Sequence, residues 1–212
     1  DDGWSVIGFG RDLARAEMKP KYGDSLKLIY CDLSDTLSVE TALVKARELG
    51  INWDLFISAA GTMEPIGRFF DIDFKDFSKS LDINVLGQLE ILHGVWPFRT
   101  PNVTANIMLL AGGGTNGPFK NYAAYCISKI ALIKMCELIH DEAEDSNAFI
   151  IGPGYTRTRI HDETLKAGGA LAGDSFEKTK AFLSDETISG TSFDDIYSHM
   201  QWCIQNGREV SG

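Results

Sequence analysis

Short apolar runs alternate with longer amphipathic stretches along most of this chain. The short runs are rich in Val, Ile, Leu and Phe and are apolar on both faces, as is typical of parallel strands covered by helices on both sides. They predict strands at 4–7, 26–31, 55–59, 107–110 and 149–151. Since longer helical patterns separate these runs, the sequence predicts an α/β fold in a single domain, a doubly wound parallel sheet of Rossmann type with three layers.

Apolar residues at helical spacing predict helices at 38–49, 81–96, 121–140 and 193–205. Ser192 is placed to cap the start of the last helix and Gly207 to end it. The segment 156–190 is polar and only weakly periodic, and it follows a strand end. Ligands of doubly wound sheets bind beyond the carboxyl ends of the strands, so we interpret 156–190 as a substrate lid. The alternative is a surface loop with a short helix around 176–183.

Composition narrows the class of protein. The 212 residues are 44% hydrophobic and 24% charged, as in one globular domain, and no run of 18 uncharged apolar residues predicts a membrane span. The N-terminus lacks the pattern of a signal peptide, so we expect a cytoplasmic protein. The net charge of −10 disfavours nucleic acid as a partner. The four cysteines form no Cys-x-x-Cys pair and the four histidines no His-Glu-x-x-His pattern, so reduced thiols and no metal site are expected.

Tyr125 and Lys129 are four residues apart in a predicted helix and therefore share a face. A phenol near its ordinary pKa of about 10 transfers protons poorly at neutral pH, but a nearby ammonium favours the phenolate and lowers that pKa. The pair therefore suits proton transfer to a carbonyl or from an alcohol. The spacing alone also occurs by chance in many proteins.

Further residues around this pair give the chain a resemblance to the short-chain dehydrogenase/reductase family. The landmarks, in order, are Asp32-Leu33 after a strand, Ser58-Ala59-Ala60-Gly61 after the next, Asn84 in a helix, Tyr125-x-x-x-Lys129, and Pro153-Gly154-Tyr155-Thr156-Arg157-Thr158. Asparagines of the family's Asn-Asn-Ala-Gly pattern are replaced here by Ser58 and Ala59.

The resemblance implies an oxidoreductase that transfers a hydride between a nicotinamide cofactor and a carbonyl or secondary alcohol. Tyr125 would be the general acid/base, Lys129 would bind the nicotinamide ribose and lower the Tyr125 pKa, and Asn84 would anchor a water that relays protons. The resemblance also assigns residues to cofactor binding: Asp32, Leu33, Ala60, Gly61, Asn84, Tyr125, Lys129, Pro153, Gly154 and Thr158. Arg11, which follows the first predicted strand, can pair with a 2′-phosphate and favours NADP over NAD.

Two departures from the family pattern stand out. The family's serine lies 13 or 14 positions before the tyrosine, where this chain has Gly112 and Ala111, and we consider Thr115 as a substitute donor. The family's N-terminal Gly-x-x-x-Gly-x-Gly turn has no counterpart, and its strand would lie between strands 4–7 and 55–59. We therefore expect a gene product longer by about 30 N-terminal residues, the size of a βαβ unit, and a last strand that begins near residue 210.

Gly112-x-Gly114-x-x-Gly117 also fits a dinucleotide fingerprint. Pro118 and Phe119 delay the next helix, however, and the following strand ends without an acidic residue, so we interpret this segment as a flexible loop at the catalytic site.

Two other functions stay open from sequence. The missing serine is compatible with a catalytically impaired dinucleotide-binding regulatory protein, and the Tyr/Lys pair also serves nucleotide-sugar epimerases and dehydratases that hold NAD tightly. The helices at 81–96 and 121–140 carry apolar residues on more than one face. In the family such helices form subunit contacts, so a homodimer or homotetramer is expected.

Overall fold

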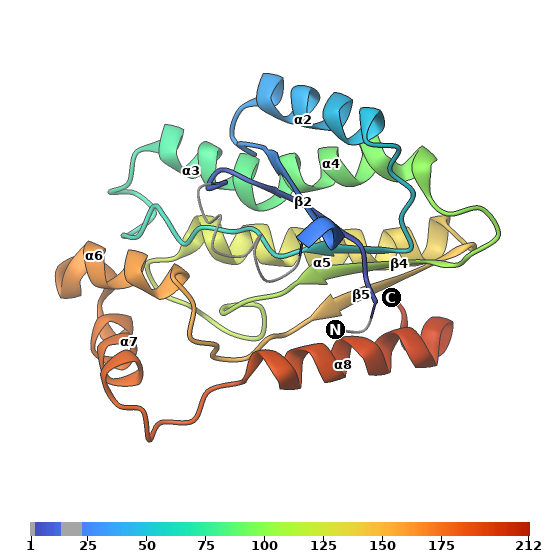
Figure 1. Ribbon diagram of the computed structural model, residues 1–212. Coiled ribbons are helices and arrows are strands. Elements are labelled where there is room, and N and C mark those ends of the chain that lie inside the picture. Colours follow the sequence, from blue (N-terminus) through green and yellow to red (C-terminus); the bar gives the residue numbers. More distant parts are fainter. Residues whose placement is uncertain (1–2, 14–22) are drawn as a thin grey trace.

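The computed structural model describes residues 3–13 and 23–212 (Figure 1). It contains all five predicted strands: β1 (Val6–Gly10), β2 (Leu26–Tyr30), β3 (Leu55–Ser58), β4 (Ala105–Leu110) and β5 (Ser146–Ile151). The α-helices are α2 (Thr36–Glu48), α3 (Phe74–Leu81), α4 (Gly87–Val95), α5 (Ala123–Glu142), α6 (Ile160–Ala172), α7 (Asp174–Ser184) and α8 (Phe193–Asn206). All strand pairs are parallel, which confirms the predicted α/β class.

The strands form two sheets. One consists of β1 and β2 and the other of β3, β4 and β5 in that order. Within the described residues no strand bridges β1 and β3, and this is the position at which the family resemblance places a further strand. β1 covers residues 6–10, so it begins two residues and ends three residues later than the predicted run 4–7.

Side chains of β4 alternate between two cores. Ile107 and Leu109 pack in the cluster that α2, α4 and α5 cover, whereas Met108 points to the other face, where α8 contributes Met200 and Cys203. Figure 1 shows α2, α4 and α5 on one side of the strands and α8 on the other. Burial on both faces explains why the strand sequences are continuously apolar.

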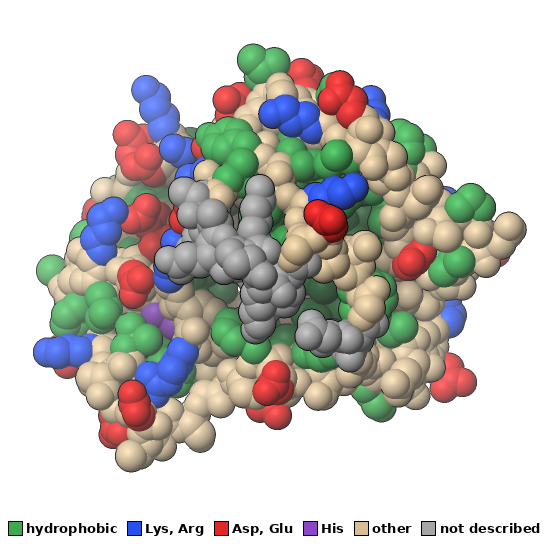
Figure 2. Space-filling model, viewed as in Figure 1, with side chains coloured by type: hydrophobic (Ala, Val, Ile, Leu, Met, Phe, Trp, Pro, Cys, Tyr) green, Lys and Arg blue, Asp and Glu red, His purple; other side chains and the backbone are tan. Residues whose placement is uncertain are grey.

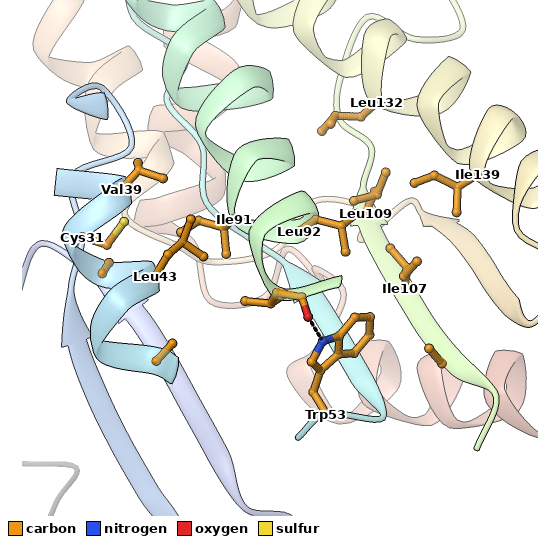
Figure 3. Packing of buried hydrophobic residues seen from close by; sticks show 14 of the residues in the cluster. Cys31, Val39, Leu43, Trp53, Ile91, Leu92, Ile107, Leu109, Leu132 and Ile139 are labelled. Carbon is orange, nitrogen blue, oxygen red and sulfur yellow. Dashed lines mark hydrogen bonds between the residues drawn. The ribbon is translucent and has the colours of Figure 1, made fainter. Parts of the chain in front are cut away.

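Trp53 anchors the larger of these cores. Its indole N–H donates a 2.8 Å hydrogen bond to the Val95 carbonyl at the end of α4, so the only polar atom of this buried ring is satisfied (Figure 3).

The predicted helix 81–96 is part of a longer helical run. The Asp73 side chain caps α3, and Asp82–Leu86 (η3) form a π-helical turn before α4. A π turn adds one residue to the helical turn and commonly marks a functional position, and Asn84 lies within it.

The C-terminal region begins as predicted. Ser192 and Asp195 form a capping box at the start of α8, and Gly207 ends this helix with φ 54°. The strand expected near residue 210 is not formed, because Gly207–Val210 (η5) make a 3₁₀ turn. The chain end still lies beside β5, since Gly212 N–H donates to the Ala148 carbonyl at 2.9 Å.

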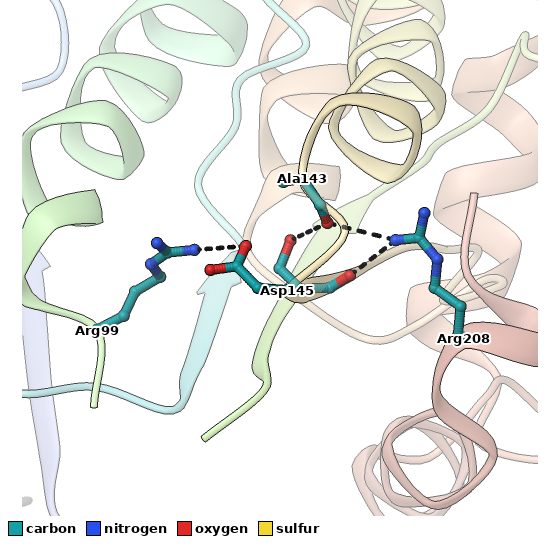
Figure 4. A network of polar contacts seen from close by, with 5 residues as sticks. Arg99, Ala143, Asp145 and Arg208 are labelled. Atoms are coloured by element: carbon teal, nitrogen blue, oxygen red, sulfur yellow. Dashed lines mark hydrogen bonds and ion pairs between the residues drawn. The ribbon is translucent and has the colours of Figure 1, made fainter. Parts of the chain in front are cut away.

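Two arginines hold the turn between α5 and β5 (Figure 4). Arg99, which follows the 3₁₀ turn Trp96–Phe98 (η4), pairs with Asp145 at 3.1 Å. Arg208 of η5 donates to the carbonyls of Ala143 and Ser146. The two side chains approach the turn from opposite sides: Arg99 binds a carboxylate, and Arg208 satisfies the Ala143 carbonyl that the end of α5 leaves free.

Segment 156–190 is mainly helical. It forms α6, with a non-helical kink at Gly168 (φ 75°), and α7. The short helix predicted around 176–183 corresponds to α7, whereas α6 was not predicted. Both helices lie beyond the end to which β4 and β5 point (Figure 1).

Acidic and basic side chains are interspersed on the face shown in Figure 2. No helix among residues 3–13 and 23–212 is long and apolar enough to cross a bilayer.

Candidate active site

The predicted site residues gather at the carboxyl ends of the strands. Four of the five strands are followed by one or more of them: Arg11 after β1, Asp32 and Leu33 after β2, Ala60 and Gly61 after β3, and Pro153 and Gly154 after β5. Open parallel sheets bind their ligands at this edge.

Tyr125 and Lys129 lie on one face of α5 and reach the end of β4. The Lys129 ammonium is 5.6 Å from the centre of the Tyr125 ring and donates a 3.0 Å hydrogen bond to the carbonyl of Leu110. Both side chains are buried, with 7% of Tyr125 and 4% of Lys129 exposed. The structure therefore brings the predicted pair together and directs it towards the strand ends.

The charge states of this pair differ from the expectation. Burial, with smaller effects of Cys126 and Glu163, raises the pKa of Tyr125 to about 12. The lowering of the Tyr125 pKa by Lys129, expected from sequence, is thus not observed. Burial also lowers the pKa of Lys129 from 10.5 to about 8, so its ammonium group is still mostly protonated at pH 7 but is held less firmly than that of an exposed lysine.

Asn84 is fully buried in the π turn and organises the segment after β3. Its Oδ1 accepts from Thr62 N–H at 2.8 Å, and its Nδ2 donates to the Thr62 carbonyl at 2.8 Å and to Ser128 Oγ at 3.1 Å. Ser128 Oγ in turn donates to the Tyr125 carbonyl at 2.7 Å. Asn84 therefore connects the β3 turn to the helix that carries the Tyr/Lys pair.

A second amide holds the same turn one helical turn later. Gln88 Nε2 donates to the carbonyls of Ala60 and Ile83, and Gln88 Oε1 accepts from the Ser58 hydroxyl. Ser58 thus has a local structural partner although it departs from the family pattern.

Gly61 provides room beside the pair. A Cβ at Gly61 would be 3.5 Å from Asn84 Oδ1, 3.8 Å from Lys129 Nζ and 3.9 Å from Ile160 Cδ1. A backbone without a side chain thus leaves space beside the Lys129 ammonium, which can donate a hydrogen bond to a sugar hydroxyl. Because Gly61 leaves this space beside Lys129, the residues at this edge fit a nicotinamide cofactor.

Arg11 and Asp32 form a second polar group at the ends of β1 and β2. Their side chains are 4.0 Å apart, with 64% of Arg11 exposed. Asp32 Oδ1 accepts from Ser34 N–H and its hydroxyl, and the first of these bonds is the main reason that the pKa of Asp32 is lowered. The backbone carbonyl of Leu33 lies against Gly87, where a Cβ would be 2.4 Å away, so α4 starts in close contact with this turn.

The loop between β4 and α5 contains Gly112 and follows Ala111, the positions at which the family has its serine. The Thr115 hydroxyl, considered as a substitute, donates to the Gly112 carbonyl at 3.1 Å. The helix α5 begins only at Ala123, so the glycines at 112, 114 and 117 do not open a helix and the dinucleotide fingerprint is not formed there. Instead Gly114, at φ 85°, lies so close to Cys126 that a Cβ would be 2.3 Å from its sulfur.

Sequence reasoning missed Glu163, on α6. Its Oε2 accepts from the Thr62 hydroxyl at 3.0 Å and from Met63 N–H at 2.5 Å. Burial is the main cause that raises its pKa. Asp162 and Glu163 stand together in the first turn of α6, and the sequence contains no feature that distinguishes them.

The start of α6 is connected to α7 by the residues that follow Gly154. The Thr158 carbonyl accepts from His161 N–H, and the buried His161 ring packs against the Tyr155 ring. The Tyr155 hydroxyl shares a hydrogen bond with Thr179 of α7. Arg157 donates to carbonyls at the end of α7. Tyr155, Arg157 and His161 thus have structural partners in the segment that covers the pair.

These features define a class, the dinucleotide-binding α/β proteins with a Tyr/Lys pair at the strand ends. A family model described as "Enoyl-(Acyl carrier protein) reductase" matches residues 2–179. The chain belongs to the short-chain dehydrogenase/reductase family, whose members are NAD(P)-dependent oxidoreductases.

Among its curated relatives are two uncharacterized oxidoreductases. The one from Schizosaccharomyces pombe is 28% identical over 148 residues, covering 68% of this chain and 58% of the relative. The one from Saccharomyces cerevisiae is 27% identical over 204 residues, covering 92% and 79%. This chain thus spans less than two thirds of the first relative and about four fifths of the second.

A solved structure described as the closed form of serine dehydrogenase complexed with NADP+ shares the fold. It superposes with a TM-score of 0.75 at 20% identity, covering 98% of this chain and 82% of that chain. The predicted family and fold class are confirmed by these comparisons.

Proposed function

We propose that this protein interconverts a carbonyl and a secondary alcohol with NADP(H), using Tyr125 as general acid/base. The observation that carries the proposal is the meeting of Tyr125 and Lys129 beside Gly61 and Asn84, at the carboxyl ends of parallel strands. The cofactor supplies or accepts the hydride when bound, and the protein supplies position and a proton.

Tyr125 would hold the proton that the substrate oxygen receives in reduction. With a pKa raised to about 12 by burial, its phenol is protonated throughout the neutral range, which suits a proton donor to a carbonyl. Lys129 would hydrogen-bond the nicotinamide ribose. Asn84 would keep Thr62 and Ser128 in place and, as the resemblance implies, contact the water of a proton relay.

For the remaining predicted residues, a role in cofactor binding is proposed from their positions at the ends of the strands. Asp32 and Leu33 would contact the adenine end, and Ala60, Gly61, Pro153, Gly154 and Thr158 would border the nicotinamide end. Gly154 has φ 68° and lies against Thr191, where a Cβ would be 2.2 Å from the hydroxyl oxygen, so a side chain is not tolerated at this turn.

Preference for NADP is proposed from Arg11. Its guanidinium is largely exposed at the end of β1, as a partner of a 2′-phosphate must be, and Asp32 holds it only weakly at 4.0 Å. The related fold solved with NADP+ is compatible with this preference. Arg11→Ala should lower kcat/KM for NADPH while leaving that for NADH unchanged. Equal losses with both cofactors would contradict the preference.

Segment 156–190 is proposed as the substrate lid. α6 covers Tyr125, because Ala172 of this helix packs in one buried cluster with Tyr125, Met63, Ile66 and Tyr122. A hydrogen bond from Thr62 to Glu163 also joins α6 to the turn after β3. Closing such a segment would exclude water from the reacting atoms.

Association into a homodimer or homotetramer is proposed from α5 and the π turn. Ile127 and Ile130 of α5 are 50% and 46% exposed, and Leu86 of η3 is 59% exposed. α3, η3 and α5 pack against one another, so these side chains lie on neighbouring elements.

The main experiment is to measure oxidation of NADPH with a panel of aldehydes and ketones. Turnover that Tyr125→Phe abolishes supports the proposal. The second candidate is a regulatory dinucleotide-binding protein, which the burial of the Tyr/Lys pair and the glycine at position 112 favour. Binding of NADPH without turnover of any substrate would support that second candidate.

A further inference from the structure

A carboxylate of α6 lies against the turn that follows β3. Glu163 is in the first turn of this helix, and its Oε2 accepts from the Thr62 hydroxyl at 3.0 Å and from Met63 N–H at 2.5 Å. The next residue, Thr164, contacts the Met63 sulfur at 3.6 Å, and Ile160 of the same helix packs in the cluster that contains Met63. Glu163 is therefore on the face of α6 that points from the proposed lid towards the strand ends.

The two residues that bind Glu163 also border the Tyr/Lys pair. Thr62 directly follows Gly61, where a Cβ would be 3.8 Å from the ammonium nitrogen of the pair. Met63 packs with Tyr125 in one buried cluster. Glu163 also contributes to the raised pKa of Tyr125, as a negative charge near the phenol must. A substrate that places its carbonyl oxygen at Tyr125 therefore has this carboxylate beside it.

No positive charge compensates Glu163 among residues 3–13 and 23–212. None of the ion pairs in this part of the chain includes Glu163, and its Oε1 accepts no hydrogen bond there. The charged side chain that shifts its pKa, Glu64, is another acid and raises this pKa further. Lys166 pairs with Glu64 instead, at 3.3 Å. The carboxylate of Glu163 therefore has one oxygen available to a ligand and no cation that competes for it.

The hydrogen bonds that Glu163 makes do not explain why the residue is charged. A glutamine could accept from Thr62 and Met63 through its amide oxygen without the cost of burying a charge. That cost is real here, because burial is the main cause that raises the pKa of Glu163. Acids with such pKa shifts are typical of binding and catalytic sites when they lie beside reacting groups. The charge of Glu163 thus points to a ligand rather than to the fold.

We propose that Glu163 is a specificity-determining residue that selects carbonyl or alcohol substrates carrying an ammonium group. This inference rests on the proposed function of Tyr125. An ammonium donates a charge-assisted hydrogen bond to a carboxylate, and Oε1 of Glu163 is the acceptor available for it. In reduction the hydride adds to the carbonyl carbon and the Tyr125 proton to the oxygen, so the ammonium itself is unchanged. A substrate that ends in a carboxylate is repelled at the same place.

The test uses three methyl ketones of similar shape, with NADPH as the cofactor. One ends in a protonated dimethylamino group, its isostere ends in an isopropyl group, and levulinate ends in a carboxylate; longer homologues of each vary the reach of the end group. We expect the wild type to favour the ammonium ketone over the isopropyl ketone by about tenfold or more in kcat/KM, as a hydrogen bond to a charged group contributes. Glu163→Gln should lose this preference. An unchanged ratio in Glu163→Gln, or a wild type that favours the isopropyl ketone or levulinate, would overturn the inference.

Glu64→Gln is the matched control, because it removes the same charge from a side chain that is 52% exposed and already paired with Lys166. It should keep the preference. A purely structural role of Glu163 would change kcat/KM for all three ketones alike and leave their ratio constant. If the wild type turns over no aldehyde or ketone, the proposed function fails and binding decides the inference: with NADPH present, the ammonium ketone should raise the Tm of the wild type more than that of Glu163→Gln. Equal shifts, or no shift in the wild type, would then overturn the inference.

Discussion

Glu163 and Thr62, which are 101 positions apart in the chain, share a hydrogen bond of 3.0 Å that joins α6 to the segment after β3. The same carboxylate oxygen accepts from Met63 N–H. Because Asn84 holds Thr62 on its other side, α6, the β3 turn and the π turn form one connected unit around Tyr125. This carboxylate thus joins the hydrogen bonds of Thr164 to Tyr122 and of the Leu171 carbonyl to Asn121 in holding the proposed lid over the reacting group.

Removing this contact should loosen α6. Glu163→Ala leaves two donors without their acceptor and should cost about 1–3 kcal/mol of stability. The exposed neighbour Asp162 supplies the control, because Asp162→Asn should change the Tm little. Chemical denaturation of the three proteins measures the difference, and equal stabilities would show that the contact does not hold the lid.

The pH dependence of this contact has a definite sign. Burial raises the pKa of folded Glu163 above its ordinary value of 4.5, so in the window above about pH 4.5 the folded state binds the proton more readily than the unfolded state. The contribution of Glu163 to stability therefore falls as pH rises through that window. Glu163→Gln, which stays neutral and keeps an acceptor, should gain Tm relative to the wild type as pH rises above about 4.5, the ordinary pKa of the carboxyl. A constant difference in Tm across this range would contradict the expectation.

Tyr125→Phe should reduce turnover by about 10²–10⁴, the usual contribution of a general acid/base. Because the Tyr125 pKa is about 12, carbonyl reduction should vary little from about pH 6 to about pH 9, while alcohol oxidation, which needs the phenolate, should rise with pH. Tyr122→Phe is the control. It removes a buried hydroxyl that shares a hydrogen bond with Thr164, so it should lower Tm and retain turnover. The opposite pattern in the two variants would exclude Tyr125 as the proton donor.

Lys129 should reduce stability at neutral pH. Its pKa is lowered from 10.5 to about 8 by burial, which corresponds to a cost of roughly 3 kcal/mol at 1.36 kcal/mol per unit. That cost is fully present below about pH 8 and disappears as pH rises to about 10.5, where the unfolded chain also loses the proton.

Lys129→Met should therefore unfold at the same or a higher temperature than the wild type at pH 7, and lose this advantage above about pH 10. The same variant should lose turnover. Thermal unfolding at both pH values and NADPH turnover measure the two effects. A large loss of Tm at pH 7 would show that Lys129 is a structural residue.

The exposed stripe of α5 should control association. Ile127→Asp combined with Ile130→Asp places two charges on the proposed subunit contact and should convert the oligomer to a monomer in light scattering. Leu37→Asp is the control, because Leu37 is 69% exposed on α2, away from this contact. A monomeric wild type would contradict the proposed association directly.

Sequence patterns predicted the elements well where local physics decides them. The five apolar runs became strands because residues buried on both faces of a parallel sheet must be continuously apolar, and Ser192 and Gly207 delimit α8 through cap geometry that involves only neighbouring residues. The four-residue spacing of Tyr125 and Lys129 likewise placed both on one face of α5.

Tertiary contacts decided the properties that depend on distant residues. The sequence carried no sign of the Glu163 contact, since that carboxylate meets Thr62 only after α6 folds over the strand ends. Nor did it predict the direction of the Tyr125 pKa, because the desolvation that raises this pKa comes from packing that encloses the phenol. Helix and strand periodicity is a property of neighbouring residues, whereas burial and the contacts of Glu163 arise only when segments far apart in the chain pack together.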